Sequence, residues 1–238
     1  MLSVELLTLQ NKEVELLRLL TKKGELEREL QEKREQLRSL LAQVEAAAQK
    51  LAEKEEHLRE LKNFVEHKRQ RIEELQRQKE QARSREEYKK ILRAIAKNED
   101  EIIKTRQEIA KVEAEVEALQ EAYQKVKEQV EPKKAVLEEE IRELERELER
   151  LNGKIAKVEE EIESIKASVP KEELEQFEKL KSKFNGLVFA DISSGACEGC
   201  GMTFSPAEFK ELLKNLTPGR SRCPYCGRFI YAKTKVGG

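Results

Sequence analysis

Apolar residues recur every seven positions over most of the first 170 residues of this chain. A first series occupies Leu2, Leu9, Leu16, Leu30, Leu37, Val44, Leu51, Leu58, Val65 and Ile72. A second series occupies Tyr88, Ile95, Ile102, Ile109, Val116, Tyr123, Val130, Leu137, Leu144, Leu151, Val158 and Ile165. Heptads sustained over this length, with Glu, Lys and Arg between them, predict left-handed coiled-coil helices.

The two series do not join, because the apolar positions lapse between residues 76 and 86. Ser84 followed three residues later by Glu87 is a capping box, which predicts the start of a new helix. We therefore expect an antiparallel helical hairpin in which residue i faces about residue 164 minus i. Pro132 lacks a backbone donor, so we expect a kink there and not a break. The alternative is two unpaired helices that dimerise in parallel with a second chain, which leaves the matched arms and the cap unexplained.

Composition and charge both change near residue 180. Eight of the ten glycines and all four cysteines follow residue 185, and the net charge changes from -6 over residues 1–180 to +5 over residues 181–238. We expect a mainly α protein with two domains. A coiled-coil hairpin spans 1–170, with its turn near 77–86, and a short helix plus a small cysteine-containing domain spans 171–238.

The four cysteines form two Cys-x-x-Cys pairs separated by 22 residues, and a glycine follows each pair. These residues are Cys197, Cys200, Cys223 and Cys226. A tight turn of this kind directs backbone N–H groups at the sulfurs, and the glycine accepts a positive φ. Four thiolates at this spacing suit one tetrahedral Zn²⁺ ion in a closed structural site, so the sequence predicts a C-terminal zinc ribbon.

The cysteines have two alternative interpretations. Cys223-Pro224-Tyr225-Cys226 also matches the active-site tetrad of glutaredoxins, but a redox motif of that type opens a helix, and Gly-Arg-Phe-Ile-Tyr reads as a strand. A disulfide-linked pair is less expected in a cytosolic protein.

Weaker patterns complete the C-terminal region. A helix should start at Pro170 and end at Asn185-Gly186, with residues 187–192 forming a strand. Ser205 and Glu208 predict a second short helix between the cysteine pairs. The small apolar core should come from Phe204, Phe209, Phe229 and Tyr231. Zinc binding, worth on the order of 10 kcal/mol in small fingers, should supply most of the stability of this domain.

Composition limits the classes of function. Charged residues make up 40% of the chain and aromatic residues 5%, with no Trp, which excludes a large globular core. No apolar run is long enough for a membrane span, and Glu5 interrupts any signal-peptide core, so we expect a cytoplasmic protein. A two-helix coil and a closed thiolate site offer no catalytic pocket, and His57 and His67 read as solvated coil residues, so we expect no enzyme.

Two basic regions are candidates for contact with a protein partner or nucleic acid, although a solvated surface is the simpler reading of both. At the hairpin turn, residues 68–93 hold ten Lys or Arg against five Glu, with Arg83 and Arg85 at the turn itself. The ribbon candidates are Arg220, Arg222, Arg228, Lys233 and Lys235. Either region could attract phosphates, and such binding would weaken steeply with salt.

The chain resembles the bacterial coiled-coil proteins that end in a four-cysteine zinc ribbon. The resemblance is carried by residues 195–202, Gly-Ala-Cys-Glu-Gly-Cys-Gly-Met, by residues 223–231, Cys-Pro-Tyr-Cys-Gly-Arg-Phe-Ile-Tyr, and by Glu87-Tyr88 at the turn. It implies a long hairpin followed by a small ribbon, and partner binding in place of catalysis. The implied partners are the nitrogen-type alternative sigma factor, with a flagellar-gene connection in some bacteria, and messenger RNA.

We therefore expect a regulatory adaptor that binds a transcription component through the ribbon and the adjacent coil. The interface should include apolar ribbon groups such as Phe204 or Phe229. An RNA-binding protein that uses the basic regions is one alternative, and a structural spacer is another. The coiled-coil faces also permit a homodimer. Because the second arm returns to the N-terminus, the ribbon should lie near residues 1–15.

Overall fold

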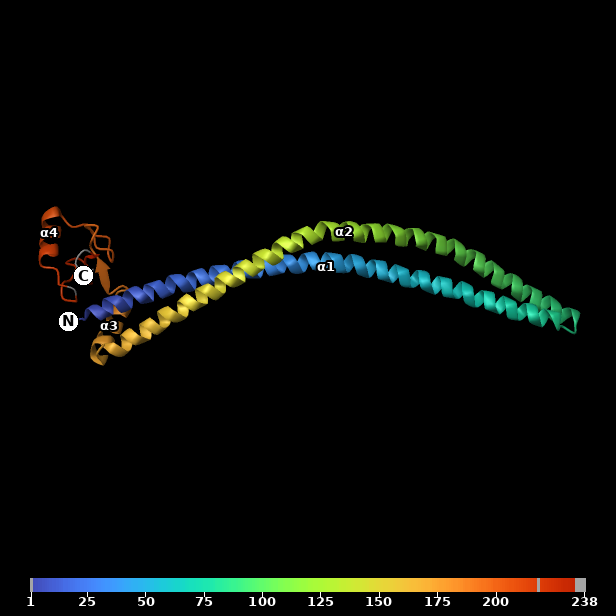
Figure 1. Ribbon diagram of the computed structural model, residues 1–238, viewed down its shortest axis with the longest axis horizontal. Coiled ribbons are helices and arrows are strands. Elements are labelled where there is room, and N and C mark those ends of the chain that lie inside the picture. The colour runs from blue at the N-terminus through green and yellow to red at the C-terminus, as the bar shows by residue number, and fades with distance from the viewer. Residues whose placement is uncertain (1, 218, 234–238) are drawn as a thin grey trace. The chain divides into compact units, whose positions relative to one another are not determined.

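The computed structural model describes residues 2–217 and 219–233. Within these ranges the elements are α1 (Val4–Glu80), α2 (Arg85–Ser168), α3 (Lys171–Lys183), β1 (Phe189–Asp191), α4 (Pro206–Lys214) and β2 (Phe229–Tyr231). Helices α1 and α2 pack against each other as an antiparallel hairpin (Figure 1). The predicted fold class, a long helical hairpin followed by a small zinc ribbon, is confirmed.

The hairpin turn is short and carries the predicted cap in a modified form. Helix α1 ends at Glu80 and α2 begins at Arg85. The N–H of Glu87 donates to Ser84 Oγ at 3.1 Å, as in a capping box. The carboxylate of Glu87, however, accepts from the N–H of Arg83 at 3.2 Å. Ser84 therefore caps α2, and Glu87 also ties down the residue that precedes the cap.

The two heptad series form the inner faces of the hairpin, with one exception at the turn. Val65, Val116 and Val158 are buried, and most other members of the series are buried or half-buried. Tyr88 is 43% exposed, whereas Ile91 and Ile95 pack with Leu75. The second apolar seam therefore starts three residues later than the heptad count predicts.

Pro132 does not interrupt α2, which is helical from Arg85 to Ser168. This agrees with the expectation that the proline does not break the helix. Among the described residues, no helix has an apolar stretch long enough to cross a membrane.

The register of the hairpin follows the predicted one beside the turn, where Leu75 packs with Ile91, and departs from it further along the arms. Lys12 pairs with Glu161 at 2.7 Å, and Lys54 pairs with Glu115 at 2.6 Å. The rule of 164 minus i places residues 152 and 110 opposite these lysines, nearer to the turn than the acids that pair with them. The prediction assumed arms of equal length, whereas α1 has 77 residues and α2 has 84.

The chain divides into two compact units. One contains the described residues up to Glu29 together with those from Leu144 onward, and the other is Leu30–Glu143. In the first unit, Leu2, which precedes α1, and Leu6 and Leu9 in its first turns share a hydrophobic cluster with Phe177 of α3 and Phe189 of β1. The expected proximity of the ribbon to residues 1–15 is therefore confirmed.

The strands β1 and β2 form a parallel pair that separates two apolar clusters. Phe189 lies opposite Phe229, and Ala190 opposite Ile230. Phe229 and Tyr231 belong to the cluster formed with the coil, whereas Ile230 packs with Cys197 and Cys223. Because side chains alternate along a strand, β2 contributes to both clusters. The predicted ribbon core of four aromatics is therefore wrong for Phe229 and Tyr231, which pack against helices.

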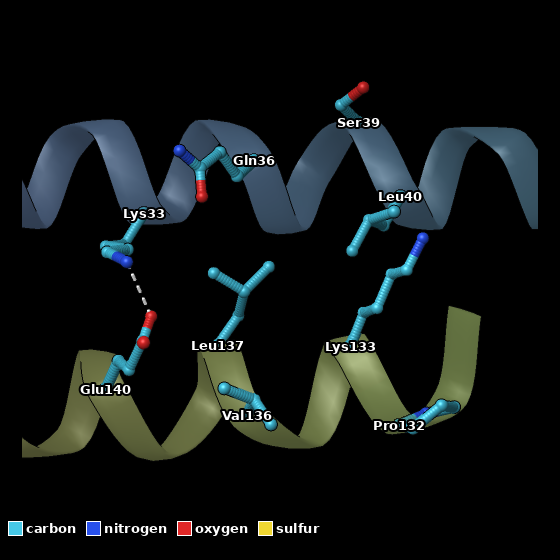
Figure 2. Close-up of a pocket in the computed structure, with 9 residues that line it drawn as sticks. All are labelled: Lys33, Gln36, Ser39, Leu40, Pro132, Lys133, Val136, Leu137 and Glu140. Carbon is cyan, nitrogen blue, oxygen red and sulfur yellow. Dashed lines mark ion pairs between the residues drawn. The ribbon is translucent and has the colours of Figure 1, made fainter. Parts of the chain in front are cut away.

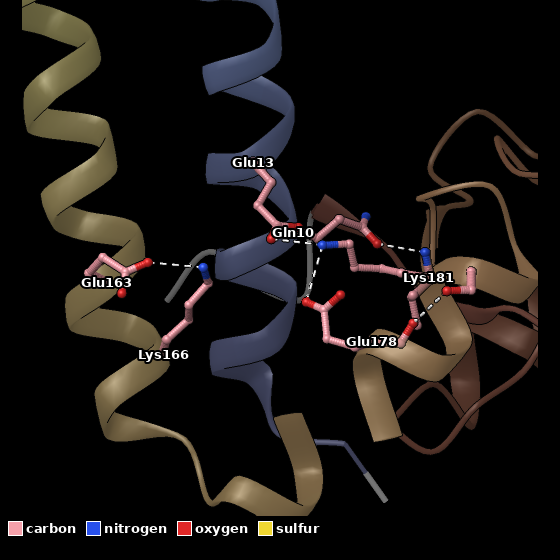
Figure 3. Close-up of polar contacts among 8 residues, drawn as sticks. Gln10, Glu13, Glu163, Lys166, Glu178 and Lys181 are labelled. Atoms are coloured by element: carbon pink, nitrogen blue, oxygen red, sulfur yellow. Dashed lines mark hydrogen bonds and ion pairs between the residues drawn. The ribbon is translucent and has the colours of Figure 1, made fainter. Parts of the chain in front are cut away.

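Polar contacts join α1 to α3 and β1 in the same unit (Figure 3). Gln10 is 2% exposed, and its amide donates to the carbonyl of Phe189 at 2.8 Å. Its Oε1 accepts from the N–H groups of Val188 and Phe189 at 2.7 and 2.8 Å. Lys181 donates to Glu13 at 2.9 Å. Gln10 thus occupies the edge of β1 that would otherwise have unpaired backbone groups.

Helix α3 and its end follow the sequence prediction. The helix spans Lys171–Lys183, and Phe177 is fully buried on its inner face. Asn185 and Gly186 have φ values of 52° and 88°, and the N–H of Gly186 donates to the carbonyl of Lys181 at 2.9 Å. A left-handed C-terminus of this kind ends the helix and directs the chain into β1.

Candidate metal centre

The first cysteine pair lies in a tight turn. The N–H of Gly201 donates to the carbonyl of Cys197 at 2.7 Å, and the N–H of Cys197 donates to the carbonyl of Met202 at 2.9 Å. Gly201 has a φ of 72°, a value that side chains disfavour. The local sequence therefore builds the knuckle, and the glycine after the second cysteine is required by the backbone.

The second pair repeats this construction. The N–H of Gly227 donates to the carbonyl of Cys223 at 2.9 Å, and the N–H of Cys223 donates to the carbonyl of Arg228 at 2.8 Å. Gly227 has a φ of 76°. The two knuckles thus have matching hydrogen bonds and present their cysteines in equivalent positions.

The four sulfurs converge on one point. All four Sγ atoms lie within 4.8 Å of one another. The Cys197–Cys226 and Cys200–Cys223 sulfur distances are both 3.9 Å. Sulfurs at about 2.3 Å from a tetrahedral Zn²⁺ lie about 3.8 Å apart, so this donor set fits one zinc ion.

The surroundings of Cys197, Cys223 and Cys226 shift the pKa values of these thiols in different directions. Burial raises the pKa of Cys197 to about 12 and also raises the pKa of Cys223. Burial acts in the same direction at Cys226, but the backbone and side chain of Arg228, with the sulfurs of Cys200 and Cys223, lower its pKa to about 7. Zinc binds thiolates, so loading the site releases protons. The bound ion would supply the positive charge that holds the thiolates together.

The cysteines differ in burial, and the first knuckle is attached to β1. Cys197 and Cys223 are buried, Cys226 is half-buried and Cys200 is exposed. The N–H of Glu198 donates to the carbonyl of Asp191 at 3.0 Å, which attaches the first knuckle to β1. Four cysteine ligands leave a zinc ion no open position, so the centre can stabilise the fold but cannot bind and activate water.

Arg228, one of the predicted contact residues, is engaged within the fold. It is half-buried, and its guanidinium donates to the carbonyls of Leu187 and Phe184 at 2.9 and 3.0 Å. It also lies 4.9 Å from the centre of the Phe184 ring. Arg228 therefore connects the second knuckle to the end of α3.

The other basic candidates lie in different surroundings. Arg222 is exposed, donates to the carbonyl of Gly227 at 2.9 Å and lies 4.0 Å from the centre of the Phe229 ring. Lys233 pairs with Asp191 at 3.0 Å while its side chain stays 75% exposed. Arg220 is exposed. The two turn candidates, Arg83 and Arg85, are exposed in the other unit, and Lys235 lies outside the described residues.

Sequence reasoning missed Gln10 as the residue that joins α1 to the backbone of Val188 and Phe189. Gln10 lies outside the heptad positions, so the periodicity assigns it to the solvated face. No local signal identifies it, because its hydrogen-bond partners are nearly 180 residues away in the sequence. The one unusual feature nearby is the density of leucines. Residues 2–9 contain Leu2, Leu6, Leu7 and Leu9, which is more apolar residues than a heptad seam needs over this length.

The comparisons agree with this geometry. Residues 196–230 match the model of the C4-type zinc ribbon domain. The C4-type zinc ribbon thus contains all four cysteines, the helix α4 and most of β2. Its spacing and its converged sulfurs together support one structural zinc ion.

The whole chain is similar in fold to two solved structures. The first, CT398 from Chlamydia trachomatis, has a TM-score of 0.63 and 15% identity, and the match covers 96% of each chain. The second, a protein from Mycobacterium smegmatis, has a TM-score of 0.58 and 17% identity over 95% of each chain. No curated protein sequence matches this chain. At these identities the likeness shows a shared fold alone.

A separate apolar groove lies between α1 and α2 in the other unit (Figure 2). It has a volume of about 710 Å³ and is lined by Leu40, Pro132 and Val136, among others. The ion pair between Lys33 and Glu140, at 2.7 Å, borders it. Leu137 and the exposed polar side chains of Gln36, Ser39 and Lys133 complete its lining.

Proposed function

We propose that this protein is a non-enzymatic regulatory adaptor that binds a transcription component of the sigma-factor class. Binding would use the C4-type zinc ribbon and the adjacent coil. The observation that carries the proposal is a groove, here called the ribbon–coil groove, whose walls come from both parts. It has a volume of about 640 Å³ and is lined by residues that include Val14, Arg18 and Leu19 of α1 and Leu187, Tyr231 and Lys233 of the ribbon region.

The groove supports joint recognition because its two walls belong to one compact unit. The cluster that contains Leu9, Phe177 and Phe229 holds the start of α1 against β1 and β2. Gln10, which also lines the groove, hydrogen bonds to Phe189. A partner seated there would contact ribbon and coil at once, on a surface that zinc binding keeps in shape.

Exposed apolar side chains in the same unit are further candidates for the interface. Met202 follows the first knuckle, Tyr225 lies within the second, and both are 47% exposed. Phe204 and Phe229, which the sequence suggested as interface groups, are only 5% and 3% exposed. They are core residues, so Met202 and Tyr225 replace them in the proposal.

The non-enzymatic part of the proposal is supported by the chemistry of the sites. A four-thiolate zinc centre leaves no position for substrate or water. Binding of a sigma factor of the nitrogen type is inferred from the resemblance of the two knuckles and of Glu87-Tyr88 to the zinc-ribbon coiled-coil proteins. Such a partner would place the protein in the cytoplasm.

Direct binding to purified nitrogen-type sigma factor tests the proposal. We expect the zinc-loaded full-length chain to bind it, and the housekeeping sigma factor to bind more weakly. Arg18→Glu in the groove should weaken binding about tenfold, because a charge is reversed in the interface. Lys157→Glu is the matched control, since Lys157 is exposed on α2 and does not line the groove.

The alternatives predict different results in affinity capture from bacterial lysate with and without nuclease. A sigma factor retained after nuclease treatment supports the adaptor. RNA recovered with proteins that are lost on nuclease treatment would favour the RNA-binding alternative. Recovery of neither would favour a structural spacer.

A further inference from the structure

The start of α2 carries two apolar surfaces, and only one of them is covered by α1. Ile91 and Ile95 are buried against Leu75. Tyr88 and Leu92 are 43% and 41% exposed. Large apolar side chains are normally found on the seam of a coiled coil, so this second pair is not explained by the hairpin.

The exposed pair belongs to a continuous stripe on α2. Arg85 lies three and four residues before Tyr88 and Lys89, and Leu92 lies four and three residues after them, which places all four on one helix face. All four are exposed. We call this set the tip stripe.

Several exposed cations around the tip stripe have no acidic partner among the residues that the structure describes. The exposed cations here are Arg83, Arg85, Lys89, Lys90 and Arg93. Over the described ranges, none of their side chains forms an ion pair or hydrogen bond, although the backbone of Arg83 donates to Glu87. Residues 77–93 contain seven Lys or Arg against Glu80, Glu86 and Glu87.

Elsewhere in the same unit, several lysines pair with acids of the opposite helix. Lys54 pairs with Glu115 at 2.6 Å, and Lys68 pairs with Glu101 at 2.7 Å. The tip lacks such cross-helix pairs among the described residues. The positive electrostatic potential of the tip therefore extends into solvent. An anionic partner could pair with these cations without displacing an existing acidic partner.

We propose that the tip stripe is a docking site for an acidic amphipathic helix of a protein partner. Tyr88 and Leu92 are four residues apart, so their side chains form a ridge of the kind that packs into the groove of a second helix. The apolar residues of the partner helix would lie against both side chains. Acidic residues beside the partner's apolar face would meet Arg85 and Lys89. A single-stranded nucleic acid would stack a base on the Tyr88 ring and pair its phosphates with the cations, but its binding would not depend on Leu92. This site is separate from the ribbon–coil groove and does not depend on the proposed sigma-factor binding.

A fluorescein-labelled 21-residue peptide tests the site with the full-length protein. The probe carries Leu at helical i, i+3, i+4 and i+7 spacing and Glu beside it, and the matched control peptide carries Lys in place of Glu. We expect the acidic peptide alone to bind in fluorescence anisotropy. Tyr88→Ala and Leu92→Ala should each weaken binding about tenfold, whereas Tyr88→Phe should retain it.

Matched variants and a competing probe make the test decisive. Ile103→Ala, at an exposed apolar position further along α2, and Lys111→Glu, at an exposed cation, should leave peptide affinity unchanged. Circular dichroism should show equal helicity for all variants. Absence of peptide binding, or binding that is insensitive to Leu92→Ala, would overturn the proposal. So would tighter binding of a 20-residue oligouridylate that requires Tyr88 but not Leu92.

Discussion

Gln10 and Phe189 exchange two hydrogen bonds through one side chain. The amide of Gln10 donates to the carbonyl of Phe189, and its Oε1 accepts from the N–H of Phe189, both at 2.8 Å. The side chain thus makes the same two hydrogen bonds to the edge of β1 that the backbone of a neighbouring strand would make. Through this contact the start of the long hairpin becomes part of the zinc-ribbon fold.

Replacement of Gln10 by Leu should therefore be severe for an α1 residue. Two N–H groups and one carbonyl of Val188 and Phe189 would lose their partner in a buried place, at a cost on the order of 3 kcal/mol. Urea unfolding and amide hydrogen exchange at residues 188 and 189 would measure the loss. Asn11→Ala, at the exposed neighbouring position, should change the free energy of unfolding by less than about 0.5 kcal/mol. Equal effects of the two variants would contradict the assigned role.

Gly219 provides a second test of the junction. Its φ is 75°, its carbonyl accepts from the N–H of Leu2 at 3.1 Å, and an added Cβ would collide with the Leu2 carbonyl. Gly195 has a φ of 81° with open space around the Cβ position. Gly195→Ala should cost about 1 kcal/mol through backbone conformation alone. Gly219→Ala should cost at least about 1 kcal/mol more in thermal unfolding, because it also displaces the start of α1. Similar melting temperatures for the two variants would exclude the close contact.

Arg228 and Arg222 should respond differently to replacement by Leu. Arg228→Leu removes donors from the carbonyls of Phe184 and Leu187, and we expect a loss of about 2 kcal/mol or more in stability. Arg222→Leu, at an exposed position with one backbone hydrogen bond, should cost less than about 1 kcal/mol. Chemical unfolding monitored by tyrosine fluorescence checks both. A loss of partner binding on Arg228 substitution therefore needs a stability control before it is assigned to the interface.

Zinc removal should disorder the ribbon and spare the hairpin. Cys197→Ser or a strong chelator should abolish the binding of one zinc ion per chain, as measured by metal analysis. Far-ultraviolet circular dichroism should change little, because α1 and α2 contain most of the helical residues. Zinc affinity should fall as the pH is lowered, because protons compete for the thiolates and burial raises the pKa of Cys197 to about 12. Met202→Ala should keep the zinc, and a zinc-free wild-type ribbon with native hydrogen exchange would refute the prediction.

Local patterns were sufficient for the elements and for the metal ligands. The heptads predicted both long helices, Ser84 predicted the start of α2, and Ser205 with Glu208 predicted α4 with its reciprocal cap. The two Cys-x-x-Cys-Gly segments predicted the four sulfurs that converge. These features succeed because each depends on residues within a few positions of one another, so the chemistry is visible in a short window.

Tertiary structure alone decided the register, the membership of the core and the surroundings of the basic residues. Lys12 pairs with Glu161 and not with a residue near 152, and β2 places Phe229 against the coil. Tyr88 is exposed although it occupies a heptad position. Gln10 is buried although it does not, because its side chain hydrogen bonds to β1. The physical reason is common to all of them. A heptad specifies which side of a helix is apolar, but which distant surface covers that side depends on packing between segments far apart in the chain.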